Sequence, residues 1–281
     1  MSEGWFAGLD PTDHEGATER IRKGSAASPY DWPALAVESG FATDTDDYYA
    51  RLHEVALATA RTVVTERERA DDQQVIHAVR AMDDTGRMAN ELAERVVEWA
   101  GSRFDESGTG IEYCRELTER DADDPADERV RALAEQAVSL DDERAALEAF
   151  TERVVSGVAP NLAALAGPTL AARLLALAGG LEPLAKTSSS TVQVLGAEEA
   201  LFAHLRGTAP SPKHGIIYTH EYVRGTRSEK RGSAARALAG KLTIAARIDH
   251  YAGDRRPELE ADLTERMAQI RETDEENDDA S

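Results

Sequence analysis

Residues 126–158 have the sequence ADERVRALAEQAVSLDDERAALEAFTERVVSGV. Large apolar residues recur there seven positions apart, at Leu133, Leu140, Leu147 and Val154, with Val130 and Ala137 between them. A seven-residue apolar repeat lines one face of a helix and is typical of a coiled coil. The stretch therefore predicts a long amphipathic helix that packs against another helix.

The preceding part of the chain predicts the partner of this helix. Residues 44–100 contain no Pro and one Gly, Gly86, so they predict one long helix or two nearly continuous ones. A polar region, 101–125, with a short helix expected near 111–117, separates the two long elements. Together they predict an antiparallel hairpin. The expected seam of the first helix consists of positions 75, 79, 82, 86, 89, 93, 96 and 100.

This seam is narrow and rich in Ala, so a single hairpin would bury little apolar area. We therefore expect the hairpin to pair with a second copy and form a homodimer. The alternative is an ordinary hairpin that packs on its own domain.

The C-terminal half predicts a compact helical domain. Residues 161–184 are rich in Ala and Leu on nearly every face and stop near Gly179-Gly180, which predicts a buried helix. A hydroxyl-rich loop follows at 187–191, and residues 215–218 are expected to be a strand or part of a loop. The fold class is therefore mainly all-α. Further helices are expected at about 196–205, 228–252 and 257–272, the last followed by an acidic tail.

Residues 1–45 are expected to be irregular, because Gly and Pro interrupt them too often for long helices. Seven of the 15 aromatic residues nevertheless fall by residue 49. Disordered tails are usually poor in aromatics, so this region should fold onto its own chain or onto a partner. The expected domains are the N-terminal region 1–45, the hairpin 46–158, the compact domain 159–256, and the C-terminal helix and tail 257–281.

The composition indicates adaptation to high salt. The chain has 53 acidic and 32 basic residues, a net charge of −21. Net charge bears on solubility and association more than on fold, and an acidic transcription or histone-binding protein is the alternative. The single cysteine, Cys114, excludes an internal disulfide or a multi-Cys metal site within one chain. With no basic start and no long apolar run, the protein is expected to be cytoplasmic, without a membrane part.

The charge reverses toward the C-terminus. Between His204 and Arg247 there are nine Lys or Arg and two acids, Glu221 and Glu229. Positive charge concentrated in an acidic chain predicts a polyanionic partner. Within this region, Lys213-His214 on a Pro-rich turn pairs a cation with a flat ring, which suits a phosphate and an unpaired base. Just before it, Gly196 opens a predicted helix whose N-terminus suits an anion.

Several motifs occur in a characteristic order: NLAAL (161–165), AARLLALAGGL (171–181), VLGAE (194–198), KHGIIY (213–218) and RGSAARALAGKLTIAARID (231–249). They resemble the NOP domain of the archaeal Nop-family core protein of box C/D small ribonucleoproteins. IHAVRAMDD (76–84) resembles the first coiled-coil helix of the same family.

The resemblance implies a coiled-coil homodimer and a NOP domain that binds box C/D guide RNA together with a kink-turn-binding ribosomal-protein homologue. It also implies an N-terminal domain that recruits the fibrillarin methyltransferase for guided 2′-O-methylation of rRNA and tRNA. The protein would then be a scaffold with no catalytic residues and no cofactor.

The resemblance also places the binding residues. Gly196, Ala197 and Glu198 are expected at the composite RNA and protein surface, and Trp5, Phe6 and Trp32 at the methyltransferase contact. The residues expected to bind RNA are Lys213, His214, Arg224, Arg227, Lys230, Arg231, Arg236 and Lys241.

The chain departs from the family pattern in three places. Glu199 stands where the family has Lys after Gly-Ala-Glu, and Ser233 replaces the Lys of Arg-Gly-Lys, so two expected cations are absent. Only about 45 residues precede the first predicted long helix, whereas the family's N-terminal domain is much longer. We therefore expect either a shortened methyltransferase-binding region or altered methyltransferase binding.

Other functions were weighed against this one. Paired aspartates on helices can bind magnesium and diphosphate, but neither Asp71-Asp72 nor Asp83-Asp84 continues into an Asp-Asp-x-x-Asp pattern. His214 and His220 lack a third metal ligand nearby in the sequence. The remaining alternatives are a spliceosomal-type NOP protein that binds kink-turn RNA without a methyltransferase, and a structural helical dimer without RNA.

Overall fold

The structure, a computed structural model, describes residues 4–26, 28 and 30–272. Over these residues it contains α-helices and one 3-10 helix and no strand, which confirms the all-α fold class. The expected acidic tail beyond residue 272 lies outside the described residues.

The N-terminal helices are α1 His14–Lys23, α2 Trp32–Glu38 and α3 Thr45–Arg69. The hairpin contains α4 Asp71–Ala100, α5 Gly110–Thr118 and α6 Pro125–Val158. The remaining elements are α7 Pro160–Ala166, α8 Pro168–Ala178, α9 Leu181–Lys186, α10 Ser189–Val194, α11 Glu198–Leu205, η1 Ile216–Thr219, α12 Glu221–Arg224, α13 Arg231–Tyr251 and α14 Glu258–Glu272.

The chain divides into two compact units, Met1–Ala70 and Asp71–Ser281. In the first, the region expected to be irregular forms α1 and α2, each capped by an aspartate that accepts a backbone N–H, Asp13 from Gly16 and Asp31 from Ala34. Such caps supply the first-turn bonds that let short helices form between Gly and Pro. The aromatics pack on their own chain, around Phe6, Phe41 and Tyr48, with Trp5 and Trp32 at the edge.

Residues 44–100 form two nearly continuous helices, the second of the two predicted alternatives. The break is at Ala70, whose backbone is extended (φ −61°, ψ 144°). The break separates two sets of contacts: α3 packs on α1 and α2, whereas α4 pairs with α6. The start of α4 is bonded within the second unit, because the Asp72 carboxylate accepts the N–H of Leu181, the first residue of α9, at 2.9 Å. The expected hairpin of 46–158 included α3, which the contacts group with the N-terminal helices.

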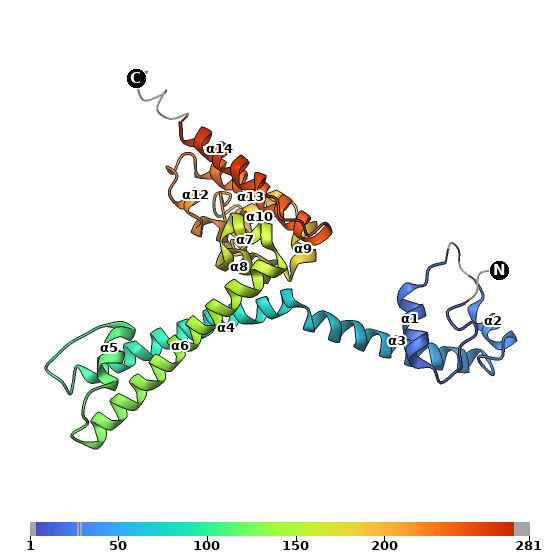
Figure 1. The fold of residues 1–281 in the computed structure, drawn as a ribbon, viewed down its shortest axis with the longest axis horizontal. Coiled ribbons are helices and arrows are strands. Elements are labelled where there is room, and N and C mark those ends of the chain that lie inside the picture. Colours follow the sequence, from blue (N-terminus) through green and yellow to red (C-terminus); the bar gives the residue numbers. More distant parts are fainter. Residues whose placement is uncertain (1–3, 27, 29, 273–281) are drawn as a thin grey trace. The chain divides into compact units, whose positions relative to one another are not determined.

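The hairpin consists of α4 and α6 side by side, with α5 packed at its tip (Figure 1). Seven of the eight predicted seam positions of α4 are buried, and the eighth, Gly86, lies against the Arg144 side chain. On α6 the line of contact differs from the prediction. The seam centres on small residues such as Ala134 and Ala137, and the leucines of the seven-residue repeat are half-buried beside it. Small side chains along this seam let the backbones of α4 and α6 approach closely.

The tip of the hairpin has a core of its own, formed where α5 covers the ends of α4 and α6. Tyr113, Cys114 and Leu117 of α5 pack there against Val96 and Val130. Cys114 is buried, and burial raises the pKa of its thiol. A neutral buried thiol is a poor nucleophile, as expected for an inert helix residue.

Residues 161–184 form three helices where the sequence predicted one. Pro168 has no N–H for the carbonyl four residues earlier, and Gly167 turns the chain at φ 77°. Gly179, at φ 87°, then ends α8 in the left-handed conformation. The apolar faces still enter one core, so the prediction of burial is confirmed while the single helix is wrong.

The core of the second unit surrounds α13, against which α7, α9, α10, α12 and α14 pack. The base of the hairpin belongs to this core, because Val75 and Val79 of α4 and Val155 of α6 are fully buried in it. Polar contacts reinforce the attachment: Arg173 pairs with Asp83 at 2.5 Å. The hairpin is therefore continuous with the compact domain.

Arg247 and Asp249 lie two positions apart on α13 and bond different helices. Asp249 accepts three hydrogen bonds from the start of α7: from Asn161 N at 3.0 Å, Asn161 Nδ2 at 2.7 Å and Leu162 N at 2.9 Å. Arg247, on another side of α13, donates to the Ala185 carbonyl at 3.0 Å. Neighbouring helical positions point in different directions, so each residue ties α13 to a different helix.

Among the described residues, no single helix is long and apolar enough to cross a membrane. α7 and α8 are together long and apolar enough to do so, but the chain bends by 117° between them and both helices lie in the core of the second unit.

Replacing Asp249 by Ala should destabilise the second unit by about 3 kcal/mol, because buried backbone and amide donors of α7 lose their acceptor. Urea denaturation followed by circular dichroism measures this. Asp262→Ala is the matched control, since it removes only an exposed ion pair with Lys241, worth under ~1 kcal/mol. Equal losses in the two variants would contradict the structural role of Asp249.

Candidate nucleic-acid and protein interface

Two segments far apart in the sequence lie side by side at the candidate site. They are residues 193–198 and 213–218, which we call the paired loops. Backbone hydrogen bonds join them, from Gly215 N to Gln193 O at 2.8 Å and from Ile216 N to Leu195 O at 2.7 Å. The Gln193 side chain adds a third, donated to the Lys213 carbonyl at 2.7 Å. The structure thus brings together two motifs that the sequence analysis considered separately.

Two glycines make this approach possible. A Cβ on Gly215 would lie 2.0 Å from the Leu195 carbonyl oxygen, closer than any side chain allows. Gly196 has φ 82°, a backbone conformation that residues with a Cβ rarely adopt, and its N–H donates to the Glu198 carboxylate at 2.9 Å. α11 accordingly begins at Glu198, two residues after the predicted start.

The run at 215–218, expected to be a strand or a loop, contributes instead to the 3-10 helix η1. The N–H groups of Gly215 and Ile216 bond the other loop, and the chain then turns so that the Tyr218 N–H reaches the Gly215 carbonyl at 3.0 Å. Bonds to the residue three positions back define a 3-10 turn, which suits short connections.

A stack of three side chains lies beside the paired loops. The His214 and Tyr218 rings are 4.6 Å apart and nearly parallel, at 20°. The guanidinium of Arg231 lies over the Tyr218 ring, 5.5 Å from its centroid. Burial lowers the pKa of His214, and the positive charges of Arg231 and Lys213 lower it further. His214 is therefore a neutral aromatic ring at neutral pH.

The other predicted cations are distributed over a wider surface. Lys213, Arg224, Arg227 and Arg236 are exposed, and Lys230 is half-buried. The Ser228 hydroxyl lowers the pKa of Glu229 most, and Arg227 and Lys213 lower it further, so these two cations lie near the same carboxylate.

Lys241 is half-buried and has a partner within the unit. Its ammonium pairs with Asp262 of α14 at 2.8 Å. The structure therefore brings Lys213, His214 and Arg231 together and separates Lys241 from them. Gln193 and Tyr218 were missed by sequence reasoning, although Tyr218 follows His214 by four positions, a spacing that brings side chains close in a helical turn.

α11 is the least covered helix of the second unit. It has no buried residue, and its Phe202 and Leu205 side chains are 58% and 70% exposed. The predicted composite surface, Gly196, Ala197 and Glu198, lies at its start. Exposed large apolar side chains beside polar groups are typical of a protein contact surface.

The N-terminal unit contains the residues predicted to contact a methyltransferase. Phe6 is only 3% exposed and packs inside the aromatic cluster. Trp5 and Trp32 are half-buried and line a pocket of about 590 Å³ with Tyr48 and Leu52. Of the three predicted residues, Trp5 and Trp32 therefore reach the surface.

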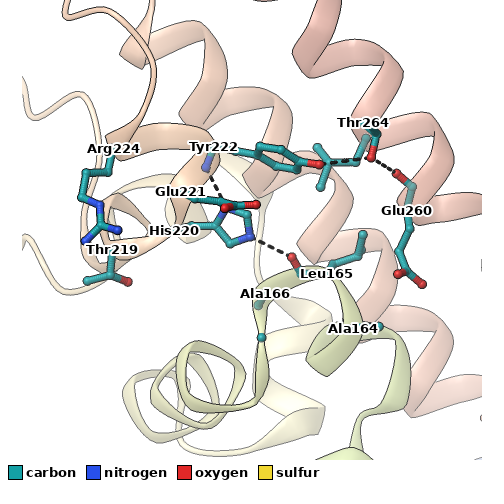
Figure 2. A pocket seen from close by; sticks show the side chains of 12 residues that line it. Ala164, Leu165, Ala166, Thr219, His220, Glu221, Tyr222, Arg224, Glu260 and Thr264 are labelled. Atoms are coloured by element: carbon teal, nitrogen blue, oxygen red, sulfur yellow. Dashed lines mark hydrogen bonds between the residues drawn. The ribbon is translucent and has the colours of Figure 1, made fainter.

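A second pocket, of about 430 Å³, lies between the end of α7, the start of α12 and α14 (Figure 2). His220 forms part of its wall. The Tyr222 N–H donates to His220 Nδ1 at 3.1 Å, so Nε2 carries the proton and donates to the Leu165 carbonyl at 3.0 Å. Burial lowers the pKa of His220, and its role is to cap α12 and join it to α7.

The aspartate pairs considered as a catalytic site have structural partners. Asp72 accepts from Leu181, Asp83 pairs with Arg173, and Asp84 pairs with Arg87. Over the described part of the chain, no group of three or more His, Cys, Asp or Glu is arranged to hold a metal ion.

The fold and the site define a class of protein: an all-α scaffold in which a hairpin extends from a helical domain that carries an exposed basic, aromatic and apolar surface. A protein-family model described as "Nop: snoRNA binding domain, fibrillarin" matches residues 49–272 of this chain. This protein therefore belongs to the Nop family, as its motifs predicted.

Individual relatives agree with this assignment. An uncharacterized NOP5 family protein of Methanocaldococcus jannaschii is 33% identical over 271 residues, covering 83% of this chain and 66% of that protein. Nucleolar protein 58 of Schizosaccharomyces pombe is 34% identical over 215 residues, covering 63% of this chain and 42% of that protein. This chain thus spans less than two thirds of the length of either relative.

A solved structure is similar over nearly the whole chain. In the crystal structure of a fibrillarin/Nop5p complex, one chain matches with a TM-score of 0.54 and 26% identity, covering 95% of this chain and 98% of that one.

Gly215→Ala should separate the paired loops, because the added methyl group has no space beside the Leu195 carbonyl. We expect a loss of stability of at least ~2 kcal/mol and changed amide shifts around residues 193–218. Gly232→Ala, in the first turn of α13, is the matched control, since its Cβ meets open space and Ala is the better helix former by up to ~1 kcal/mol. Unchanged shifts around Leu195 in Gly215→Ala would contradict the close approach.

The stability of the second unit should fall as the pH falls below 6.5, the ordinary pKa of His. The folded state, in which the pKa of His220 is lowered, takes up its proton later than the unfolded chain, so acid favours unfolding. At pH 7.5 both states are neutral at this position and nothing is lost. Urea denaturation at pH 7.5 and 5.5 measures the difference. His220→Asn can still accept the Tyr222 N–H but does not titrate, so its stability should change less; an equal change would exclude His220 as the cause.

Proposed function

We propose that this protein is the scaffold of an archaeal box C/D ribonucleoprotein. It binds guide RNA together with a kink-turn-binding ribosomal-protein homologue and recruits a fibrillarin methyltransferase for guided 2′-O-methylation of rRNA or tRNA. In this role it is not itself an enzyme. The observation that carries the proposal is the surface where the paired loops, with Lys213 and His214, adjoin the start of exposed α11.

The paired loops supply the RNA contact in this proposal. Lys213 is an exposed cation suited to a phosphate, and the neutral His214 ring beside it is suited to stacking on an unpaired base. Arg224, Arg227 and Arg236 add exposed positive charge on the same unit. Phosphate contacts fix register, while stacking on a flipped base selects the shape of the RNA.

α11 supplies the contact with the kink-turn-binding protein. Phe202 and Leu205 would be covered by an apolar surface of the partner, while Glu198 and the paired loops face the RNA edge. A composite surface of this kind explains how RNA and protein bind together, because each partner completes the interface of the other.

The N-terminal unit is the proposed site of methyltransferase recruitment. The similar chain comes from a structure named for its complex with fibrillarin, and the match covers 95% of this chain. The pocket beside Trp5 and Trp32 can take an apolar side chain of the partner. Phe6 supports these two residues from within the cluster.

The hairpin is the proposed dimerisation element. Met88, Trp99 and Phe150 are 44%, 38% and 36% exposed along it, and Leu140 is half-buried. A second hairpin packed on these side chains would bury apolar area that one hairpin leaves exposed. The acidic composition fits a salt-rich archaeal cytoplasm.

Reconstitution tests the proposal. The full chain, the kink-turn-binding protein, fibrillarin and a box C/D guide RNA should together methylate a matching target, and omission of the chain should abolish methyl transfer. A gel shift with the kink-turn RNA should show at least about tenfold tighter binding of the chain when the kink-turn-binding protein is present. Lys213→Glu should abolish this ternary assembly, because it places a carboxylate against phosphate.

Trp32→Ala separates the two functions, since it should weaken fibrillarin capture while leaving RNA assembly intact. RNA assembly without methyl transfer would support the spliceosomal-type alternative. No cooperative RNA binding in any condition would leave only a structural helical dimer.

A further inference from the structure

Arg231 is part of the basic region, yet its side chain turns toward the protein. It is half-buried at the start of α13, and its Nε donates to the carbonyl of buried Thr226 at 3.0 Å. Its guanidinium lies over the Tyr218 ring. A guanidinium held by a carbonyl on one edge and a ring beneath it is constrained in position, unlike a freely moving surface cation.

Tyr218 transmits this constraint to His214. The Tyr218 ring contacts Arg231 and stacks on His214, nearly parallel at 4.6 Å between centroids. Aromatic pairs and cation–π contacts of this kind are attractive beyond the area that they bury. The orientation of the His214 ring therefore depends on a residue 17 positions later in the sequence.

Gln193 fixes the backbone of the same segment. Its side-chain amide donates to the Lys213 carbonyl, and its own carbonyl accepts the Gly215 N–H. Lys213-His214-Gly215 is thus held through its backbone by Gln193 and through its ring by Tyr218 and Arg231.

We propose that Gln193, Tyr218 and Arg231 are positioning residues that hold Lys213 and His214 in the conformation that binds RNA, and that Arg231 acts through this stack without contacting phosphate. This inference rests on the proposed RNA-binding function. It assigns a new role to a residue whose charge alone predicted a backbone contact.

An ordered binding segment matters for this protein because salt screens the attraction between its cations and phosphates. At 1 M salt the Debye length is about 3 Å, so an exposed cation adds little affinity unless it touches a phosphate. A segment already ordered before binding avoids the entropy cost of fixing its side chains on binding. Fixed geometry therefore contributes affinity that salt does not remove.

The salt dependence of RNA binding distinguishes positioning from phosphate contact. Each phosphate contact contributes about 0.7–0.9 to the slope of log affinity against log salt concentration. The full chain and its variants would be titrated into a labelled kink-turn RNA bound to the kink-turn-binding protein, at a series of KCl concentrations. Arg231→Gln should weaken binding about three- to tenfold with an unchanged slope. Lys213→Gln should make the dependence of log affinity on log salt concentration shallower by about 0.7–0.9, as expected for the loss of one phosphate contact.

The ring of Tyr218 is tested separately. Tyr218→Leu should match Arg231→Gln, whereas Tyr218→Phe, which keeps the ring, should bind as the wild type does. In a double-mutant cycle, Arg231→Gln should have little effect once His214 is replaced by Ala, because both substitutions interrupt one stack. Arg153→Gln, an exposed arginine of α6, is the control for loss of one charge away from the site.

A slope lowered by Arg231→Gln as much as by Lys213→Gln would overturn the inference and make Arg231 a phosphate contact. Unchanged affinity in Arg231→Gln, or full additivity in the double-mutant cycle, would also overturn it. These results leave the proposed function standing, since wild-type RNA binding is retained. Absence of RNA binding by the wild type would instead end the proposed function together with the inference.

Discussion

The burial of α13 is the constraint on which the second unit depends. Its small residues, including Ala234, Ala235, Ala239, Ala245 and Ala246, are fully buried and let neighbouring helices approach its backbone closely. α10 packs on this helix, and Gln193, near the end of α10, donates a hydrogen bond to the Lys213 carbonyl of the second loop. The paired loops, and with them the candidate site, are therefore positioned by the buried apolar face of α13.

The attachment of the hairpin follows from the same core. Val75 and Val155 make the hairpin base part of the compact domain, and Asp72 fixes the point where α4 begins. Farther out the seam is narrow and the tip needs α5 to complete a small core of its own. The base of the hairpin is thus continuous with the compact domain, while apolar side chains such as Met88 and Phe150 are exposed farther along it.

Charge and geometry have different roles at the interface. A net charge of −21 favours solubility, whereas salt screens the attraction between a basic region and a polyanion. The structure uses several of those basic residues internally: Lys241 pairs with Asp262, Arg247 holds the end of α9, and Arg231 supports an aromatic stack. Fewer of the Lys and Arg side chains in this basic region therefore face solvent than their number in the sequence suggests. The positions of the exposed ones matter correspondingly more.

The sequence by itself determined the helical class, the α4 seam from Val75 to Ala100, the family and the motifs of the site, because helical periodicity and motif order are local properties. It could not give the break at Ala70, which depends on separate partners for α3 and α4. Only the tertiary structure decided that Asp249 bonds α7, that Gln193 joins Lys213, and that Arg231 turns inward. The first two contacts join residues 20 or more positions apart. The third depends on the direction of a side chain within a packed core. The spacing of residues along the chain encodes neither a distant contact nor a side-chain direction.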